Sequence, residues 1–240
     1  MTRFKNAVKI LALDTTSGAC SVALISDDQL IERFVQAERD HTRRLLPMVD
    51  EVLAEADMKL ADLDALAVSQ GPGSFTGLRI AISSVQGLAY ASDLPVVPVS
   101  SLAALALGAR RSHPEWGQYP IVAMLDARMQ QVYWGVYSTN SPSESLIPEA
   151  VQNPEEVLLS LEDSEVSAPI YGAGPGLHYD VFRQASLEAV DQACFIYARD
   201  IAQLAVPLLE QGNSVTAEEL EPVYLRNEVT WKKRQKIRSQ

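Results

Sequence analysis

Several residue types and segments are scarce in this 240-residue chain, and each scarcity excludes a class of protein. The two cysteines, Cys20 and Cys194, lie far apart in apolar surroundings, which predicts buried free thiols rather than a disulfide or a metal site. The three histidines, His41, His113 and His178, lack the spacing of a metal site. No stretch approaches 18 consecutive apolar residues and no signal-like segment follows the start, so we expect a cytoplasmic protein without a membrane span.

Basic residues are also under-represented, with 20 Lys and Arg against 31 Asp and Glu and a formal net charge of −11. An acidic surface repels the phosphate backbone of nucleic acids over most of its area. Residues 232–240 are the exception, because they hold five basic residues and no acidic one. Such a tail is most often a solvated terminus, and the alternative is a contact with RNA or with an acidic protein surface. The candidate contacts are Lys232, Lys233, Arg234, Lys236 and Arg238.

A glycine-rich stretch near the middle of the chain is the first candidate site. The apolar residues 65–68 predict a buried strand, which leads into a loop with glycines at 71, 73 and 77 and then into helical periodicity. This order can present backbone N–H groups to a phosphate. However, a Walker A loop needs a lysine and a hydroxyl residue after its last glycine, and Leu78 follows Gly77. A turn capped by Ser74 or Thr76 is therefore favoured.

The helix predicted after this loop has two distinct faces. Its bulky apolar residues share one face, which suits packing on a sheet: Leu78, Ile82, Val85 and Ala89. The adjoining face carries only small residues: Gly77, Ala81, Ser84, Gly87 and Ala91. Each glycine in a helix costs about 1 kcal/mol relative to alanine, so the small-residue face predicts close approach by another helix. That helix belongs either to the same chain or to another protein.

The chain also repeats its own pattern. A strand, Asp14, a turn and a second strand recur 112 residues later around Asp126. Two such halves predict an α/β protein with a duplicated ribonuclease-H-like (actin-like) fold, a cleft and mixed central sheets. We expect subdomains at residues 1–112 and 113–225, with the option that the C-terminal segment returns to the first, and a basic tail at 226–240. Residues 139–150 are expected to form a loop.

The strand-terminal Asp14, followed by Thr15 and Thr16, is typical of the phosphate- and Mg²⁺-binding turn of the sugar kinase, heat-shock protein and actin superfamily. In the second half, however, bulky residues 127–129 follow Asp126 where the backbone would have to approach a phosphate. A nucleotide-dependent kinase or hydrolase that uses Asp14 is therefore the alternative function, with Asp14, Thr15 and Thr16 as weak nucleotide-binding candidates. The spacing identifies no catalytic triad and no metal ligands.

Five motifs in order resemble the TsaB (YeaZ) family of partner subunits in tRNA threonylcarbamoyladenosine biosynthesis. They are ILALDTT at 10–16, HTRRLLP at 41–47, GPGSFTGLRI at 71–80, LDAR at 125–128 and EPVYLR at 221–226. The resemblance covers about residues 8 to 234. It implies an actin-like fold and a non-catalytic paralogue that binds and stabilises the catalytic subunit TsaD. With the ATPase TsaE, that pair places the threonylcarbamoyl group on N6 of adenosine 37 in tRNAs that read ANN codons.

The resemblance also implies that this chain is not itself the enzyme. TsaD holds its catalytic metal with a His-x-x-x-His pair, and the corresponding positions here are Ser101 and Leu105. Leucine cannot bind a metal, so an accessory subunit without its own cofactor is expected, with ATP or ADP only at a subunit junction. A homodimer is expected when TsaD is absent. The expected interface lies on the helices that begin near Asp40 and Thr76: Leu45, Val49, Gly77, Ala81, Ser84, Gly87 and Ala91.

Overall fold

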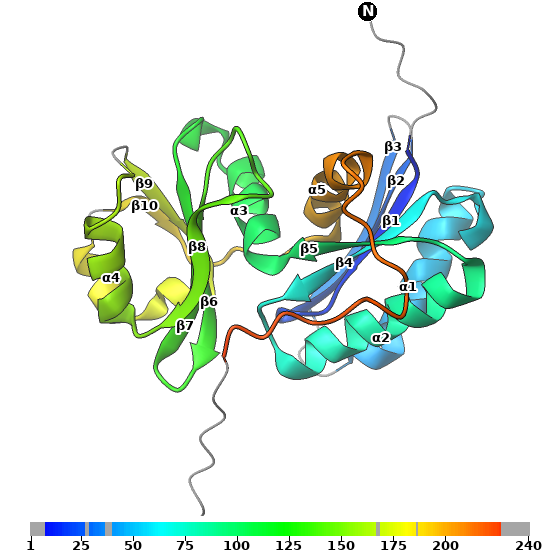
Figure 1. Ribbon diagram of the computed structural model, residues 1–240, viewed down its shortest axis with the longest axis horizontal. Helices are drawn as coiled ribbons and strands as arrows, with labels where there is room; N and C mark the ends of the chain where they lie inside the picture. Colours follow the sequence, from blue (N-terminus) through cyan, green and yellow to red (C-terminus); the bar gives the residue numbers. More distant parts are fainter. Residues whose placement is uncertain (1–7, 27–28, 37–39, 167–168, 186, 227–240) are drawn as a thin grey trace, which may run out of the picture.

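The computed structural model describes residues 8–26, 29–36, 40–166, 169–185 and 187–226. They form two α/β lobes that lie side by side (Figure 1). The sheet of the first lobe has the order β3-β2-β1-β4-β5, in which β1, β4 and β5 are parallel and β2 is antiparallel to both neighbours. Its strands are β1 (Ile10–Asp14), β2 (Ala19–Ser26), β3 (Gln29–Gln36), β4 (Ala65–Gly71) and β5 (Val96–Ser100).

The second sheet repeats this topology, with the order β10-β9-β6-β7-β8. Its strands are β6 (Ile121–Arg128), β7 (Gln131–Tyr137), β8 (Ser145–Gln152), β9 (Ile170–Ala173) and β10 (Leu187–Asp191). The predicted duplicated fold with mixed sheets is therefore confirmed. The loop predicted at 139–150 is wrong in its second half, because β8 pairs with β7 and packs Ile147 and Ala150 against the core of this lobe.

The helices occupy equivalent places in the two halves. Helix α1 (His41–Glu55) follows β3 and α4 (Pro154–Glu162) follows β8. Helix α3 (Ser101–Ser112) follows β5, and α5 (Ala198–Glu210) comes after β10. In the first half α2 (Phe75–Ser92) follows β4, whereas only the short 3₁₀ segments η3 (Pro175–His178) and η4 (Asp180–Gln184) follow β9. Two further 3₁₀ segments are η1 (Leu60–Asp62) and η2 (Pro114–Trp116).

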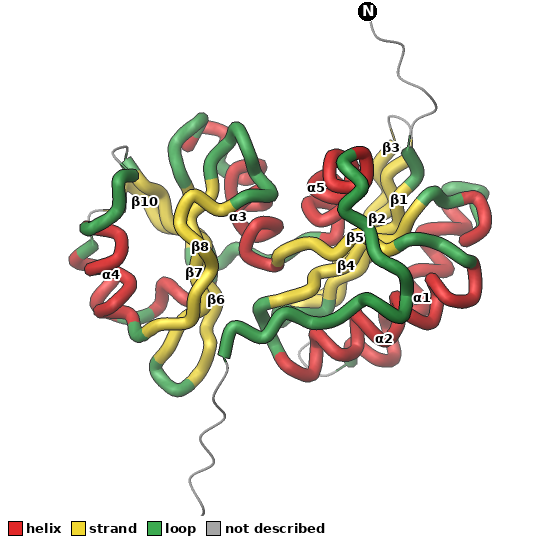
Figure 2. Tube along the Cα trace, viewed as in Figure 1, coloured by secondary structure: helices red, strands yellow, loops and turns green. Residues whose placement is uncertain are grey.

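Helices α3 and α5 join the two lobes. Figures 1 and 2 show them in the middle of the molecule, and they contact each other. Helix α5 packs on β1, β2, β4 and β5 of the first sheet, and α3 packs on β6 and β7 of the second. Their side chains share one apolar core with residues of both sheets. Across this contact, Arg111 of α3 forms two 2.9 Å hydrogen bonds with the fully buried Asp200 of α5.

The segment after α5, residues 211–226, returns to the first lobe and then reaches the second. It runs alongside α2 in Figure 1 and ends beside the β6–β7 hairpin. Val215 pairs with Val96, the Val223 N–H donates to Gln70 O at 2.8 Å, and Arg226 donates to Ala127 O at 3.1 Å. Hence α5 and residues 211–225, which lie within the predicted subdomain 113–225, make their contacts largely with the first lobe, in line with the predicted option that the C-terminal segment returns to the first subdomain. No helix in the described part of the chain is long and apolar enough to cross a membrane.

Candidate functional site

The turn after β1 places Asp14 at the centre of the molecule. Asp14 and Thr15 are fully buried, and the Thr16 N–H and hydroxyl both donate to Asp14 Oδ1, at 3.2 and 2.6 Å. The other carboxylate oxygen, Oδ2, has no hydrogen-bond partner among the described residues. Burial raises the pKa of Asp14 to about 6, against the lowering effect of its hydrogen bonds with Thr16.

The Asp14 turn packs closely against the glycine loop. The Thr15 hydroxyl donates to the Gly77 carbonyl at 2.6 Å, and the Ser74 N–H donates to Thr16 O at 2.9 Å. A Cβ on Gly73 would lie 2.9 Å from Thr16, so the glycine loop packs directly on the turn. The polar groups of Thr15 and Thr16 that make these contacts are therefore already bonded within the protein.

The equivalent turn of the second lobe is also closed. The Arg128 N–H donates to Asp126 Oδ1 at 2.8 Å, and the Arg128 side chain forms a 3.1 Å salt bridge with Asp126. Arg128, Met129 and Gln130 all have positive φ, in a tight turn that directs this arginine back onto the carboxylate. Asp126 is thus neutralised by its own turn rather than left to bind a cation.

Helix α3 holds Ser101 and Leu105, the positions where the resemblance to TsaD predicts the missing histidine pair. Ser101 and Leu105 are both fully buried, and Leu105 packs against Gly174 in the core between the lobes. Among the described residues, no group of three or more His, Cys, Asp or Glu side chains is arranged to hold a metal ion. Both cysteines are free; Cys20 is buried as predicted, whereas Cys194 is only partly buried.

Helix α2 begins as the sequence predicted. Ser74 is its N-cap and accepts a hydrogen bond from the Gly77 N–H. The predicted sheet face is buried, since all four of its members pack in the core of the first lobe: Leu78, Ile82, Val85 and Ala89. The α2 C-cap, Asp93, has a left-handed backbone conformation with φ of 53°.

The structure corrects the predicted open face of α1 and α2. Leu45 and Val49 of α1 lie in the core of the first lobe. Gly77 and Ala81 of α2 are also buried, Gly77 because it packs against the Thr15 carbonyl. These four residues point inward because α1 and α2 lie on the same sheet and contact each other. Their apolar or small side chains are explained within the monomer.

The rest of the predicted face remains accessible. Ser84 is partly buried, and Gly87 and Ala91 are exposed along the C-terminal half of α2. A Cβ on Gly87 would have no atom within 4 Å. On the neighbouring α1, Leu46 is 47% exposed. We call this accessible set, Leu46, Ser84, Gly87 and Ala91, the α1–α2 face.

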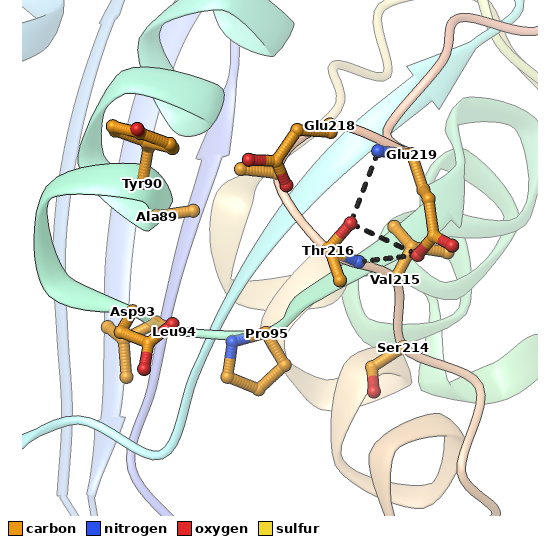
Figure 3. A pocket seen from close by; sticks show the side chains of 11 residues that line it. Ala89, Tyr90, Asp93, Leu94, Pro95, Ser214, Val215, Thr216, Glu218 and Glu219 are labelled. Atoms are coloured by element: carbon orange, nitrogen blue, oxygen red, sulfur yellow. Dashed lines mark hydrogen bonds between the residues drawn. The ribbon is translucent and has the colours of Figure 1, made fainter.

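A cavity of about 440 Å³ lies at the C-terminal end of α2, where the returning segment begins (Figure 3). Glu219 Oε2 accepts hydrogen bonds from the N–H and the hydroxyl of Thr216, both at 3.1 Å. Asp93, Tyr90 and Glu218 complete the side of the cavity that faces α2. The hydrogen bonds between Glu219 and Thr216 form a capped turn within the returning segment.

A second cavity, of about 280 Å³, lies at the other end of α2 and was not predicted. It is lined by residues of the glycine loop, α2, β7 and the returning segment: Pro72, Gly73, Phe75, Leu78, Tyr133, Val223, Tyr224 and Arg226. The (i, i+4) spacing of Phe75 and Arg79 on α2 was a usable signal, because it places them on one side of the helix. Their meeting with Tyr224 depends on the tertiary path of the returning segment.

The predicted RNA contacts, Lys232, Lys233, Arg234, Lys236 and Arg238, lie outside the described residues, so they stay predictions. The histidines each lie in a different environment. His113 Nε2 lies 2.8 Å from Asp191 Oδ2, which raises the pKa of His113, and His178 Nδ1 lies 2.8 Å from Pro175 O. His41 is buried at the start of α1.

Two lobes with the same strand order define an α/β protein of the duplicated ribonuclease-H-like class. Comparison with known proteins narrows this class. A family model described as TsaD, tRNA N6-adenosine threonylcarbamoyltransferase, matches residues 34–217. The "tRNA threonylcarbamoyladenosine biosynthesis protein TsaB" of Escherichia coli (strain K12) is 39% identical over 229 residues, covering 94% of this chain and 98% of that protein. The protein of the same name from Haemophilus influenzae is 39% identical over 236 residues, covering 93% and 96%.

Among solved structures, YeaZ from Pseudomonas aeruginosa aligns with a TM-score of 0.80 and 40% identity, covering 91% of this chain and all of that one. A second structure is titled as an uncharacterized protein with similarity to peptidase YeaZ from Pseudomonas aeruginosa. It aligns with a TM-score of 0.83 and 41% identity, covering 91% of this chain and all of that one. The chain belongs to the TsaB (YeaZ) family, which confirms the resemblance found in the sequence motifs.

Proposed function

We propose that this chain is a non-catalytic subunit of the machinery that makes tRNA threonylcarbamoyladenosine. In this proposal it binds the catalytic paralogue TsaD and acts with TsaE in the N6-threonylcarbamoylation of adenosine 37 in ANN-decoding tRNAs. Family membership supports the pathway, since its relatives are named for the biosynthesis of this nucleoside. A cytoplasmic location follows from the same role.

The non-catalytic role is supported above all by the burial of two residues of α3. Where the TsaD resemblance requires two histidines, Ser101 and Leu105 are fully buried, and Leu105 fills the core between the lobes. A metal-activated reaction needs ligands around an open position. The contacts within the turns at Asp14 and Asp126 support the same proposal, because they already use polar groups of both turns. An ATP or ADP molecule would bind only at a junction with TsaD.

The α1–α2 face is the surface that we assign to TsaD. Its small residues Gly87 and Ala91 let a partner helix approach the α2 backbone closely, and exposed Leu46 on the neighbouring α1 adds apolar area. A duplicated fold also allows like-with-like pairing of this face, so a homodimer is expected when TsaD is absent.

The test is co-purification with tagged TsaD. Ser84→Arg or Gly87→Arg places a long charged side chain on the α1–α2 face while leaving the core untouched. We expect at least a tenfold loss of TsaD binding with an unchanged unfolding transition. Ser160→Arg, at a similarly half-buried serine on α4 of the other lobe, is the matched control and should bind normally.

The same proteins provide the activity measurement. With TsaD, TsaE, tRNA, ATP and the threonylcarbamoyl precursors, wild-type chain should support tRNA modification and the two interface variants should not. The chain without TsaD should give no modified tRNA. Normal TsaD binding by both arginine variants would refute the interface, and transfer by the chain alone would refute the non-catalytic role.

A further inference from the structure

The cavity of about 280 Å³ at the N-terminal end of α2 combines aromatic and cationic side chains. Phe75 is 56% exposed and Tyr224 is 44% exposed, and their ring centroids lie 5.8 Å apart. The Arg79 guanidinium lies 4.0 Å from the centre of the Phe75 ring, and its Nε is 3.5 Å from the Tyr224 hydroxyl. Tyr133 of the second lobe and Arg226 also line the cavity, and Arg79 contacts two of its lining residues, Phe75 and Tyr224. We call this set, Phe75, Arg79, Tyr133, Tyr224 and Arg226, the aromatic–arginine groove.

Both arginines of this groove carry a charge that no described carboxylate balances. Neither Arg79 nor Arg226 forms a salt bridge with any acidic side chain in the described ranges. Arg226 instead donates to neutral groups, namely Ala127 O, Gln131 Oε1 and Met129 Sδ. Its Nε is buried and has no hydrogen-bond partner.

The Arg226 guanidinium is held by neutral partners that leave its positive charge unbalanced. An acidic peptide would satisfy the charge but would not require exposed aromatic rings. Aromatic rings beside arginines suit a planar base that is attached to a phosphate.

One further observation favours RNA over a free nucleotide. The sequence continues from Arg226 into residues 227–240, whose last nine include five basic residues and no acidic one. A basic segment that follows a stacking site in the sequence is typical of proteins that bind a single strand.

We propose that the aromatic–arginine groove binds one nucleotide of a single-stranded RNA segment. The base stacks on the exposed rings of Phe75 and Tyr224, and the phosphate binds between Arg79 and Arg226. This site is separate from the α1–α2 face, and its occupation does not require TsaD. The groove would give an otherwise acidic subunit a defined point of contact with RNA.

The experiment measures binding of a fluorescein-labelled single-stranded RNA octamer to the full-length chain by fluorescence anisotropy at two salt concentrations. Phe75→Ala should weaken binding about tenfold by removing a stacking surface. Arg79→Gln should weaken it and reduce the slope of log K against log salt by about 0.7, the share of one phosphate contact. All variants keep residues 227–240. If those residues alone bound the RNA, each variant would bind the octamer with the affinity of the wild type.

The matched controls are Tyr90→Ala and Arg183→Gln. Tyr90 is 76% exposed at the opposite end of α2, and Arg183 is an exposed arginine of the second lobe. Both controls should bind the octamer as the wild type does. Equal loss in controls and groove variants, or no loss in Phe75→Ala and Arg79→Gln, overturns the proposal.

Two competitors identify the source of the ligand. AMP should displace the octamer only weakly, because it offers a single phosphate contact, and a glutamate octapeptide should not displace it. Displacement by AMP at or below the octamer's own concentration range would instead identify a free-nucleotide site and overturn the RNA assignment. Displacement by the peptide would identify an acidic protein partner and would likewise overturn it. None of these outcomes depends on TsaD, so failure here leaves the proposed subunit role standing.

Discussion

At the scale of single residues, Asp14 is the most unusual group in the protein. Its carboxylate is fully buried, one oxygen accepts both Thr16 hydrogen bonds, and no cationic side chain neutralises it within hydrogen-bonding distance in the described structure. Burial raises its pKa from 3.8 to about 6. The neighbouring Thr15 and Thr16 pack against the glycine loop. We therefore expect Asp14 to lower stability at neutral pH.

The sign of this effect follows from proton binding. Between pH 4 and pH 6 the native state holds more protons than the unfolded state, so stability falls as pH rises through this window and stays lower above it. Asp14→Asn keeps an acceptor for Thr16 and removes the charge. It should raise the free energy of unfolding by ~1–3 kcal/mol at pH 7 and by much less near pH 4. Urea unfolding at both pH values measures this, with the exposed Asp50→Asn as control. A variant that is less stable at pH 7 would contradict the prediction.

At the scale of elements, α2 has two ends with different roles. Its N-terminal turn is fixed to the Asp14 turn by the Thr15 hydroxyl and by the close approach of Gly77. Its C-terminal half faces outward at Gly87 and Ala91. The two glycines of this helix therefore have different roles. Gly77 is required by close packing within the fold, whereas Gly87 leaves the helix surface open.

Alanine substitution separates these causes. A Cβ on Gly77 would overlap the Thr15 carbonyl oxygen, so Gly77→Ala should destabilise the protein by about 3 kcal/mol, as overpacking does. Gly87→Ala meets no atom and should stabilise the helix by up to ~1 kcal/mol. Denaturant unfolding of both variants is the measurement, and each variant controls for the other. Equal effects of the same sign would show that Gly77 is not in close contact.

At the scale of the whole molecule, the returning segment 211–226 ties the chain together. Leu220 is 2% exposed in the core of the first lobe, and its carbonyl accepts a 3.0 Å hydrogen bond from Gln86 Nε2 of α2. Six residues later, Arg226 bonds to the β6–β7 hairpin of the second lobe. The segment thus connects α2 to both lobes and forms one wall of the aromatic–arginine groove.

Truncation of one side chain tests this attachment. Leu220→Ala should lower the free energy of unfolding by about 2–3 kcal/mol, because it leaves a cavity beneath the segment. Leu159→Ala, at a 60% exposed leucine of α4, should change it by less than about 0.5 kcal/mol. Thermal and denaturant unfolding of the pair give the comparison. A Leu220→Ala effect as small as the control's would mean that the segment contributes little to the stability of the lobe.

Much of the fold could be predicted because it depends on local sequence patterns. The repeat around Asp14 and Asp126 predicted two equivalent sheets. The 3.6-residue periodicity of α2 identified the face that packs on its sheet. The strand β8 was missed because its short apolar pairs are separated by a proline and a glutamate. Its pairing with β7, not its own sequence, makes it a strand.

The sequence by itself determined the duplicated fold, the family and the capped start of α2. These features depend on periodicity, spacing and residue identity. Only the tertiary structure decided that Leu45, Val49, Gly77 and Ala81 lie inside the monomer, and that Phe75 and Arg79 meet Tyr224 and Arg226. The burial of a residue and the contacts between distant side chains depend on segments that are far apart in the chain. A small or apolar side chain also fits a core and an interface equally well.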